Sequence, residues 1–216
     1  MQLTPVLRAA CAAVLMLAGA AAQDGPPKVE QGLPPRSTPA DYQVQAQSGE
    51  FTLAAEFVQH SVPTPDGIFT NDDYIVVETA IFGPKGKRLA LTPNDFQLRV
   101  NGKKQNLPSQ PFLYALKALK SPEWEMEQAV TKAEKAKVDT GGDPNSGEKP
   151  SPPKMSMELR RAMEQKVQRA SFPEGERPLP QAGLLYFEYH GKLNGLKSIE
   201  LIYAGPAGKA TIPLQP

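Results

Sequence analysis

The 216-residue sequence contains one cysteine, two histidines and one tryptophan, and its charges nearly cancel. Because the only cysteine is Cys11, the chain cannot form an internal disulfide. With 24 basic and 23 acidic residues, it has no net field that would attract nucleic acid. Zinc sites take three or four ligands, commonly with a close-spaced pair, and His60 and His190 are far apart in sequence. We therefore expect no nucleic-acid partner, no metal and no cofactor.

The sequence also lacks the common signatures of catalytic sites. It has no Gly-x-Ser-x-Gly elbow, and the glycine-rich stretches after Gly83 and Gly205 lack the length and the Ser or Thr of a phosphate loop. The oxygen-rich loop Asp66–Asp73 does not have the spacing of an EF-hand, and turn chemistry explains the same residues. Calcium binding in this loop stays open. We expect no enzymatic activity and assign no catalytic, cofactor-binding or metal-binding residue.

Residues 1–22 have the composition of an export signal. An uncharged run of small and apolar residues follows Arg8 and ends at Ala22 in a small-x-small cleavage site. The run is shorter than the roughly 20 residues that a membrane-spanning helix needs. Cys11 lies near the start of the run rather than at its end, which favours cleavage before Gln23 over attachment of a lipid. We expect a periplasmic or secreted protein with no stable membrane insertion after signal cleavage.

The mature chain divides into four parts. Residues 23–49 are rich in proline and lack a periodic apolar pattern, which predicts a disordered leader. Alternating apolar residues predict a first set of strands in residues 50–110 and a second set in residues 181–216. Residues 111–180 lack this alternation and predict a charged helical insertion that is partly disordered.

The clearest pair of strands lies between Asp73 and Lys104, on either side of a turn that begins at Gly83. The first strand consists mainly of β-branched and aromatic residues. The second alternates, so its two faces should differ in burial: Phe96, Leu98 and Val100 are expected to be buried, and Gln97 and Arg99 exposed. The dipeptide Asn101-Gly102 predicts a tight turn in which both residues have positive φ.

Two helices are predicted within the insertion, from Pro122 to about Val138 and from Met155 to Ala170. One interpretation is a marginal helical hairpin that packs over one end of the β-domain, anchored by Trp124 and Phe172. A second is a docking element, in which a stripe on the second helix binds a partner: Met155, Leu159 and Met163. Basic residues on that helix would also suit a membrane surface, but glutamates on the same face weaken this reading. Replacing residues 121–176 by a short linker is expected to leave a folded β-domain.

Several of these segments resemble the secreted immunoglobulin-like domains of unknown function that occur in bacterial lipoproteins and periplasmic proteins. The segments are Tyr74-Ile-Val-Val-Glu, Leu91-Thr-Pro-Asn-Asp-Phe-Gln-Leu, Asn101-Gly102-Lys103, Gly183-Leu-Leu-Tyr-Phe-Glu-Tyr and Leu193-Asn-Gly-Leu-Lys-Ser-Ile-Glu-Leu. The resemblance implies a mainly β protein with an immunoglobulin-like antiparallel β-sandwich and a helical insertion. That family has no established catalytic residues, so it implies no site.

These observations predict an exported, non-enzymatic module that acts by protein binding or as a structural component of the envelope. Its partner would be an unknown envelope or extracellular protein, with the insertion as the docking element. The alternative is a small secreted hydrolase or a metal-dependent enzyme whose site is not recognisable in the sequence.

Overall fold

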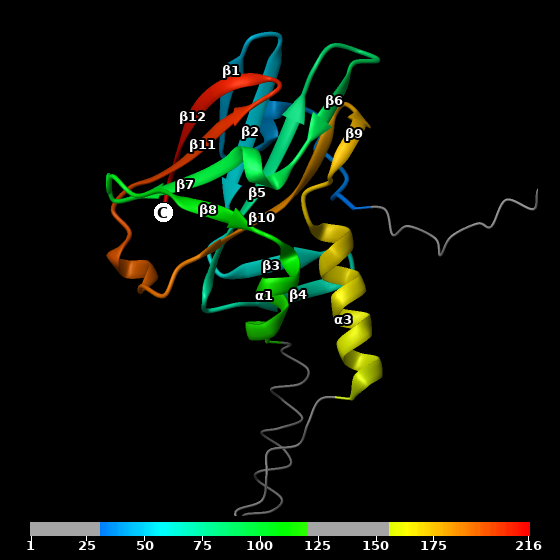
Figure 1. Cartoon of the computed structure of the whole chain (residues 1–216), viewed down its shortest axis with the longest axis vertical. Helices are drawn as coiled ribbons and strands as arrows, with labels where there is room; N and C mark the ends of the chain where they lie inside the picture. The colour runs from blue at the N-terminus through cyan, green and yellow to red at the C-terminus, as the bar shows by residue number, and fades with distance from the viewer. Residues whose placement is uncertain (1–30, 121–155) are drawn as a thin grey trace, which may run out of the picture.

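The computed structural model describes residues 31–120 and 156–216, and it is mainly β, with 47% in strands. Eight strands form one antiparallel sheet. In spatial order they are β1 (Val44–Ser48), β2 (Phe51–Phe57), β5 (Tyr74–Phe82), β10 (Gln181–Glu188), β8 (Leu107–Gln110), β7 (Phe96–Val100), β11 (Ile199–Gly205) and β12 (Gly208–Leu214). The sheet curls until β12 lies beside β1, which makes a nearly closed barrel (Figure 1).

Side chains hold the seam of the barrel together where β1 and β12 meet without a main-chain ladder. Ser48 Oγ donates to Ala207 O at 2.8 Å. Further along the seam, the Gln43 amide donates to Gln215 O at 3.2 Å, and Gln215 N donates back to Gln43 Oε1 at 3.4 Å. These hydrogen bonds satisfy main-chain groups directly before and after β12, whose open edge would otherwise invite pairing with another chain.

The mainly β prediction is confirmed, but the immunoglobulin-like sandwich is not, because the eight strands belong to one curled sheet rather than two facing sheets. The clearest pair of strands in the sequence, β5 and β7, are also not neighbours. β5 pairs with β2 and β10, whereas β7 pairs with β8 and β11. Alternation shows which side of a strand is buried, but it does not encode which strand lies next to it.

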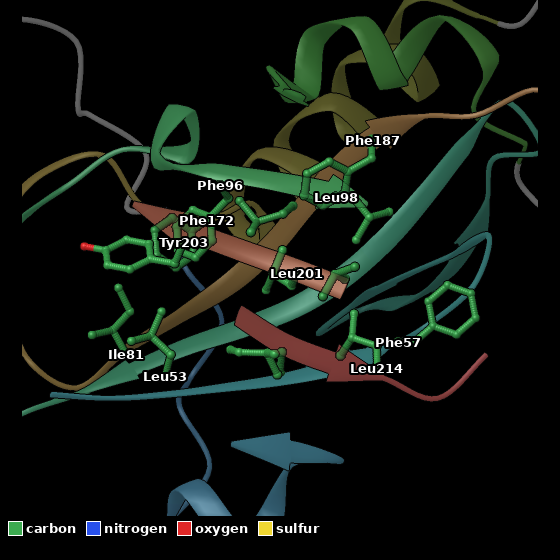
Figure 2. Close-up of a cluster of buried hydrophobic side chains, with 14 of the residues drawn as sticks. Leu53, Phe57, Ile81, Phe96, Leu98, Phe172, Phe187, Leu201, Tyr203 and Leu214 are labelled. Atoms are coloured by element: carbon green, nitrogen blue, oxygen red, sulfur yellow. The ribbon is translucent and has the colours of Figure 1, made fainter. Parts of the chain in front are cut away.

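The barrel interior is filled by inward-facing apolar side chains from all around the sheet (Figure 2). Phe96 is central to it: its ring lies 5.1 Å from that of Phe172 and 4.9 Å from that of Tyr203, between ring centroids. The predicted register of β7 is confirmed for its buried face, since Phe96, Leu98 and Val100 are 1%, 0% and 4% exposed.

The opposite face of β7 follows the prediction in part, and the turn after it follows the prediction in full. Gln97 is exposed. Arg99 is half-buried rather than exposed, because its guanidinium binds Glu200 at 3.1 Å and Asn106 at 3.3 Å. Asn101 and Gly102 have φ values of 52° and 64°, as a tight turn of this type requires.

A second layer covers the outer face of β5 and β10. It consists of the hairpin β3 (Ser61–Thr64) and β4 (Gly67–Thr70), the short helix α1 (Phe112–Ala115) with the 3₁₀ turn η3 (Leu116–Ala118), and α3 (Met157–Ala170). The Ser156 hydroxyl caps α3 by accepting from Leu159 N at 3.2 Å. The remaining elements are the pair β6 (Arg88–Leu91) and β9 (Gly175–Pro178) and the 3₁₀ turns η1 (Pro39–Asp41), η2 (Pro93–Asp95) and η5 (Leu193–Gly195).

The described part of the insertion belongs to the core of the protein. Met163 and Val167 of α3 are buried in a cluster with Leu184 and Tyr186 of β10, and Phe172 is 1% exposed inside the barrel. Excision of residues 121–176 would therefore remove part of the core, contrary to the expectation that a folded β-domain would remain. The docking stripe is also wrong, because Met163 and Leu159 pack against the protein's own outer face. The first predicted helix, Trp124 and Met155 lie outside the described residues.

The leader is ordered from residue 31, where its description begins. Residues 31–43, which we call the strap, cross the outside of the barrel and lead into β1. The prediction of a disordered leader is therefore wrong for residues 31–49. The reason is that its anchoring side chains are too far apart to form a periodic stripe. Residues 1–30, which include the predicted signal, lie outside the described residues. Within the described ranges, no helix has the length and apolar character to cross a membrane.

Candidate functional site

Three alanines form a row across the outer face of the barrel. Ala54 of β2 lies opposite Ala80 of β5, which in turn lies opposite Ala182 of β10. All three are fully buried in one cluster with Tyr42 of the strap. The small side chains of this alanine row protrude little from the sheet, so that another segment of chain can lie close to it. The strap packs directly on this row.

The N-terminal end of the strap binds through its main chain. Leu33 N donates to Ala182 O at 2.9 Å and forms an antiparallel bridge with β10. Gly32 N donates to Arg169 O, also at 2.9 Å. Gly32 has a φ of +115°, and a Cβ there would lie 3.0 Å from Ala182 O, so the close approach of the two chains requires glycine. The strap therefore adds a short piece of strand to an edge of β10.

Arg36 is the charged anchor of the strap. Its Nη1 lies 2.5 Å from Glu56 Oε2 and its Nη2 lies 2.9 Å from Glu78 Oε2. The two glutamates are directly opposite on β2 and β5, and the Glu78 side chain is only 11% exposed. Like charges in such a pair repel, so the guanidinium between them removes a cost to the sheet. Burial opposes the charge on Arg36, but the Glu78 charge and hydrogen bonds to both carboxylates raise its pKa above the ordinary value.

Tyr42 is the third anchor and closes the strap over the alanine row. The Arg36 guanidinium lies 4.4 Å from the centroid of the Tyr42 ring, and Arg36 N donates to the Tyr42 hydroxyl at 3.2 Å. The ring also meets Phe82 edge-on, with centroids 6.1 Å apart. Burial raises the pKa of the Tyr42 hydroxyl. Main-chain pairing, an ion pair and aromatic packing therefore act together on one extended segment.

Sequence reasoning missed this strap site, defined by the alanine row, Glu56 and Glu78. The residues that anchor the strap are spread over a span of nine positions, from Leu33 to Tyr42, among prolines that indicate a flexible linker. One signal was present: Glu78 stands in a strand that consists mainly of apolar and β-branched residues, and a charge at such a position needs a partner. Only the fold shows that the partner is Arg36.

The two histidines have local partners. His60 is half-buried, with Nδ1 2.7 Å from Tyr74 O. His190 is exposed, with Nε2 3.1 Å from Glu188 Oε1 and Nδ1 3.6 Å from Asp73 Oδ1. Across residues 31–120 and 156–216, no group of three or more His, Cys, Asp or Glu side chains is arranged to hold a metal ion.

Asn71 and Asp72 of the loop Asp66–Asp73 bind separate partners. Asn71 is fully buried and donates from Nδ2 to Ala115 O at 2.5 Å, while its Oδ1 accepts from Asp73 N at 3.1 Å. Asp72 pairs with Lys120 at 2.5 Å, and this hydrogen bond lowers the pKa of the carboxyl. Asn71 therefore has the turn-forming role that its residue type favours.

Large exposed apolar side chains occur on elements of the second layer. Among the described residues they are Ile68 of β4, Leu113 and Tyr114 of α1, and Met157 of α3, each more than half exposed. These elements lie at the same end of the molecule, below the barrel in Figure 1. This end is a second candidate surface, but no described segment lies across it in the way that the strap lies across the alanine row.

Comparison with known proteins does not place the chain in a family. No protein-family model matches it, and no curated protein matches it. A solved structure of a Bacillus subtilis protein assigned as a lipoprotein (ycdA) is similar with a TM-score of 0.35 and 12% sequence identity. The similarity covers 78% of this chain and 37% of that protein, so this chain spans little more than a third of its length. A TM-score this low does not establish a common fold.

Proposed function

We propose that the protein is an exported, non-enzymatic module of the bacterial cell envelope that acts by binding another protein. The observation that carries this proposal is the strap site. An extended segment is held there by a β-bridge at Ala182, an ion pair to two glutamates and an aromatic contact. These are the means by which peptide-binding domains hold their ligands. Export rests on the composition of residues 1–22.

The charged side chains at this site support binding rather than chemistry. Arg36, Glu56 and Glu78 are engaged with one another at hydrogen-bond distance. A general acid or base needs a free path to a substrate proton, and a nucleophile needs an activating base. The three side chains instead fix the position of a segment on the sheet. The proposed role is therefore recognition of a protein surface or segment.

The proposal is tested by crosslinking in living cells of a bacterial host. A photoreactive amino acid is placed at Ala40, an exposed position on the strap, and at Lys209, an exposed position on β12, as the matched control. We expect the Ala40 variant to give a discrete crosslinked species with one envelope protein and the Lys209 variant to give none. Absence of a discrete species from Ala40, together with stoichiometric metal in the purified mature protein, would instead favour the metal-dependent enzyme.

A further inference from the structure

We propose that the strap site is a recognition site for an extended, proline-rich segment of a partner protein that carries an arginine three residues after an apolar side chain. The chain's own strap has this chemistry and occupies the site in competition. This inference rests on the proposed protein-binding function and names the class of segment that the module recognises. It also implies that the strap regulates access to the site.

The strap shows which chemistry the site accepts. Pro34 and Pro35 lie between Leu33 and Arg36 and fix φ near the extended value, so less conformational entropy is lost on binding. A polyproline helix has three residues per turn, so side chains three positions apart lie on one face. Leu33 and Arg36 have this spacing, and both contact the barrel. A ligand for this site therefore presents an apolar side chain and an arginine on one face of an extended segment.

The two glutamates make the site selective for arginine. One guanidinium reaches Glu56 through Nη1 and Glu78 through Nη2, and a compact ammonium group cannot offer the same fork. Without a cation between them, two like charges would face each other on adjacent strands, and one of them is largely buried. The site therefore disfavours neutral or acidic segments as well as favouring basic ones.

The strap is held by few main-chain bonds, which makes it displaceable. Its hydrogen bonds to the second layer and to β10 are those of Gly32 N and Leu33 N. Pro34, Ser37, Thr38 and Ala40 are exposed. The alanine row, by contrast, belongs to strands that pair with one another along their length. Because the strap is tethered to the chain, it competes for the site at an effective concentration of roughly millimolar. A partner segment must therefore bind the site more tightly than the strap does, or be present above roughly millimolar concentration.

The experiment uses the full mature chain and a fluorescein-labelled synthetic peptide with the sequence of residues 31–43. Fluorescence anisotropy compares the unaltered chain with Arg36→Ala, in which the tethered strap is weakened. We expect Arg36→Ala to bind the peptide at least about tenfold more tightly, because its internal competitor is impaired. An Arg-to-Ala change in the peptide, or Glu78→Gln added to the variant chain, should weaken this binding by about tenfold or more. Arg99→Ala breaks the Arg99–Glu200 pair on the other side of the barrel and should behave as the unaltered chain.

A folded Arg36→Ala chain that does not bind the peptide overturns the inference, as does binding that is indifferent to the arginine of the peptide. If Arg36→Ala does not fold, hydrogen exchange of the unaltered chain decides. Peptide in millimolar excess should then remove protection from the Leu33 amide, which bonds to Ala182 O, and unchanged protection overturns the inference. If these peptide experiments fail but the Ala40 variant still gives a crosslinked partner, the proposed function stands. Recognition then depends on another feature of that surface.

Discussion

Gly183 of β10 lies directly against the backbone of Phe172. A Cβ at Gly183 would stand 2.4 Å from Phe172 Cα and 2.6 Å from Phe172 N, and Phe172 N donates to Leu184 O at 2.9 Å. The segment after α3 therefore occupies the edge of β10 beyond the two residues that pair with β8. This close approach places the Phe172 ring inside the barrel and fixes α3 against the outer face.

Gly183→Ala should destabilise the protein by about 2 kcal/mol or more, because the new methyl group would displace the Phe172 backbone. The measurement is urea unfolding followed by circular dichroism. Gly195→Ala is the matched control, since no atom lies within 4 Å of a Cβ built there. Equal losses from the two variants would show that the contact does not determine stability.

Phe172→Ala should cost about 3–5 kcal/mol of unfolding free energy, because it removes a fully buried ring and its edge-to-face contact with Phe96. Leu113→Ala, at a side chain that is 52% exposed, should change stability by less than about 0.5 kcal/mol. Chemical denaturation of both variants measures the difference. A small loss of unfolding free energy for Phe172→Ala would indicate that the segment after α3 is dispensable for the fold.

Leu98→Asp should prevent folding, because it places an unpaired charge at a position with no exposed surface inside the barrel. Arg99→Asp, at the adjacent position, faces outward and should cost only about 1 kcal/mol, through the lost pair with Glu200 and the new repulsion. Soluble expression and thermal melting compare the two. A comparable loss of stability in both variants would contradict the register of β7.

Asp95 should make stability fall as the pH rises from acid toward neutral. Its Oδ2 is buried without a hydrogen-bond partner, and burial raises the pKa of the carboxyl above its ordinary value of 3.8. The protonated form is thus favoured in the fold. The stabilising contribution of this protonated form is complete below pH 3.8 and is lost as the pH rises through the raised pKa of the folded state.

Asp95→Asn keeps the shape of the protonated side chain and removes its titration. At low pH the variant should melt at nearly the same temperature as the unaltered chain. As the pH increases toward neutral, the melting temperature of the variant should rise relative to that of the unaltered chain. Thermal melting of both proteins across this range checks the prediction. A difference in melting temperature that does not change with pH would contradict it.

The sequence by itself determined the local structure of this protein to a large extent. Alternation in β7 determined which of its residues face the core, because successive side chains of a strand point to opposite sides. Asn101-Gly102 determined a turn with two positive φ values, since few other residues adopt them. The apolar spacing predicted α3 from Met155 to Ala170, and the helix begins two residues later, at Met157, and ends at Ala170.

Tertiary structure alone decided how these pieces are arranged and where the candidate site lies. The order of strands around the barrel depends on pairings between residues far apart in sequence, such as Ala54 with Ala80 and Ala80 with Ala182. The strap gains its order from the same long-range contacts, because Arg36 has a stable position only once Glu56 and Glu78 have been brought side by side. Local patterns report burial and backbone preference, which depend on neighbours in sequence. The strap site depends on charges and small side chains that only the closed sheet brings together.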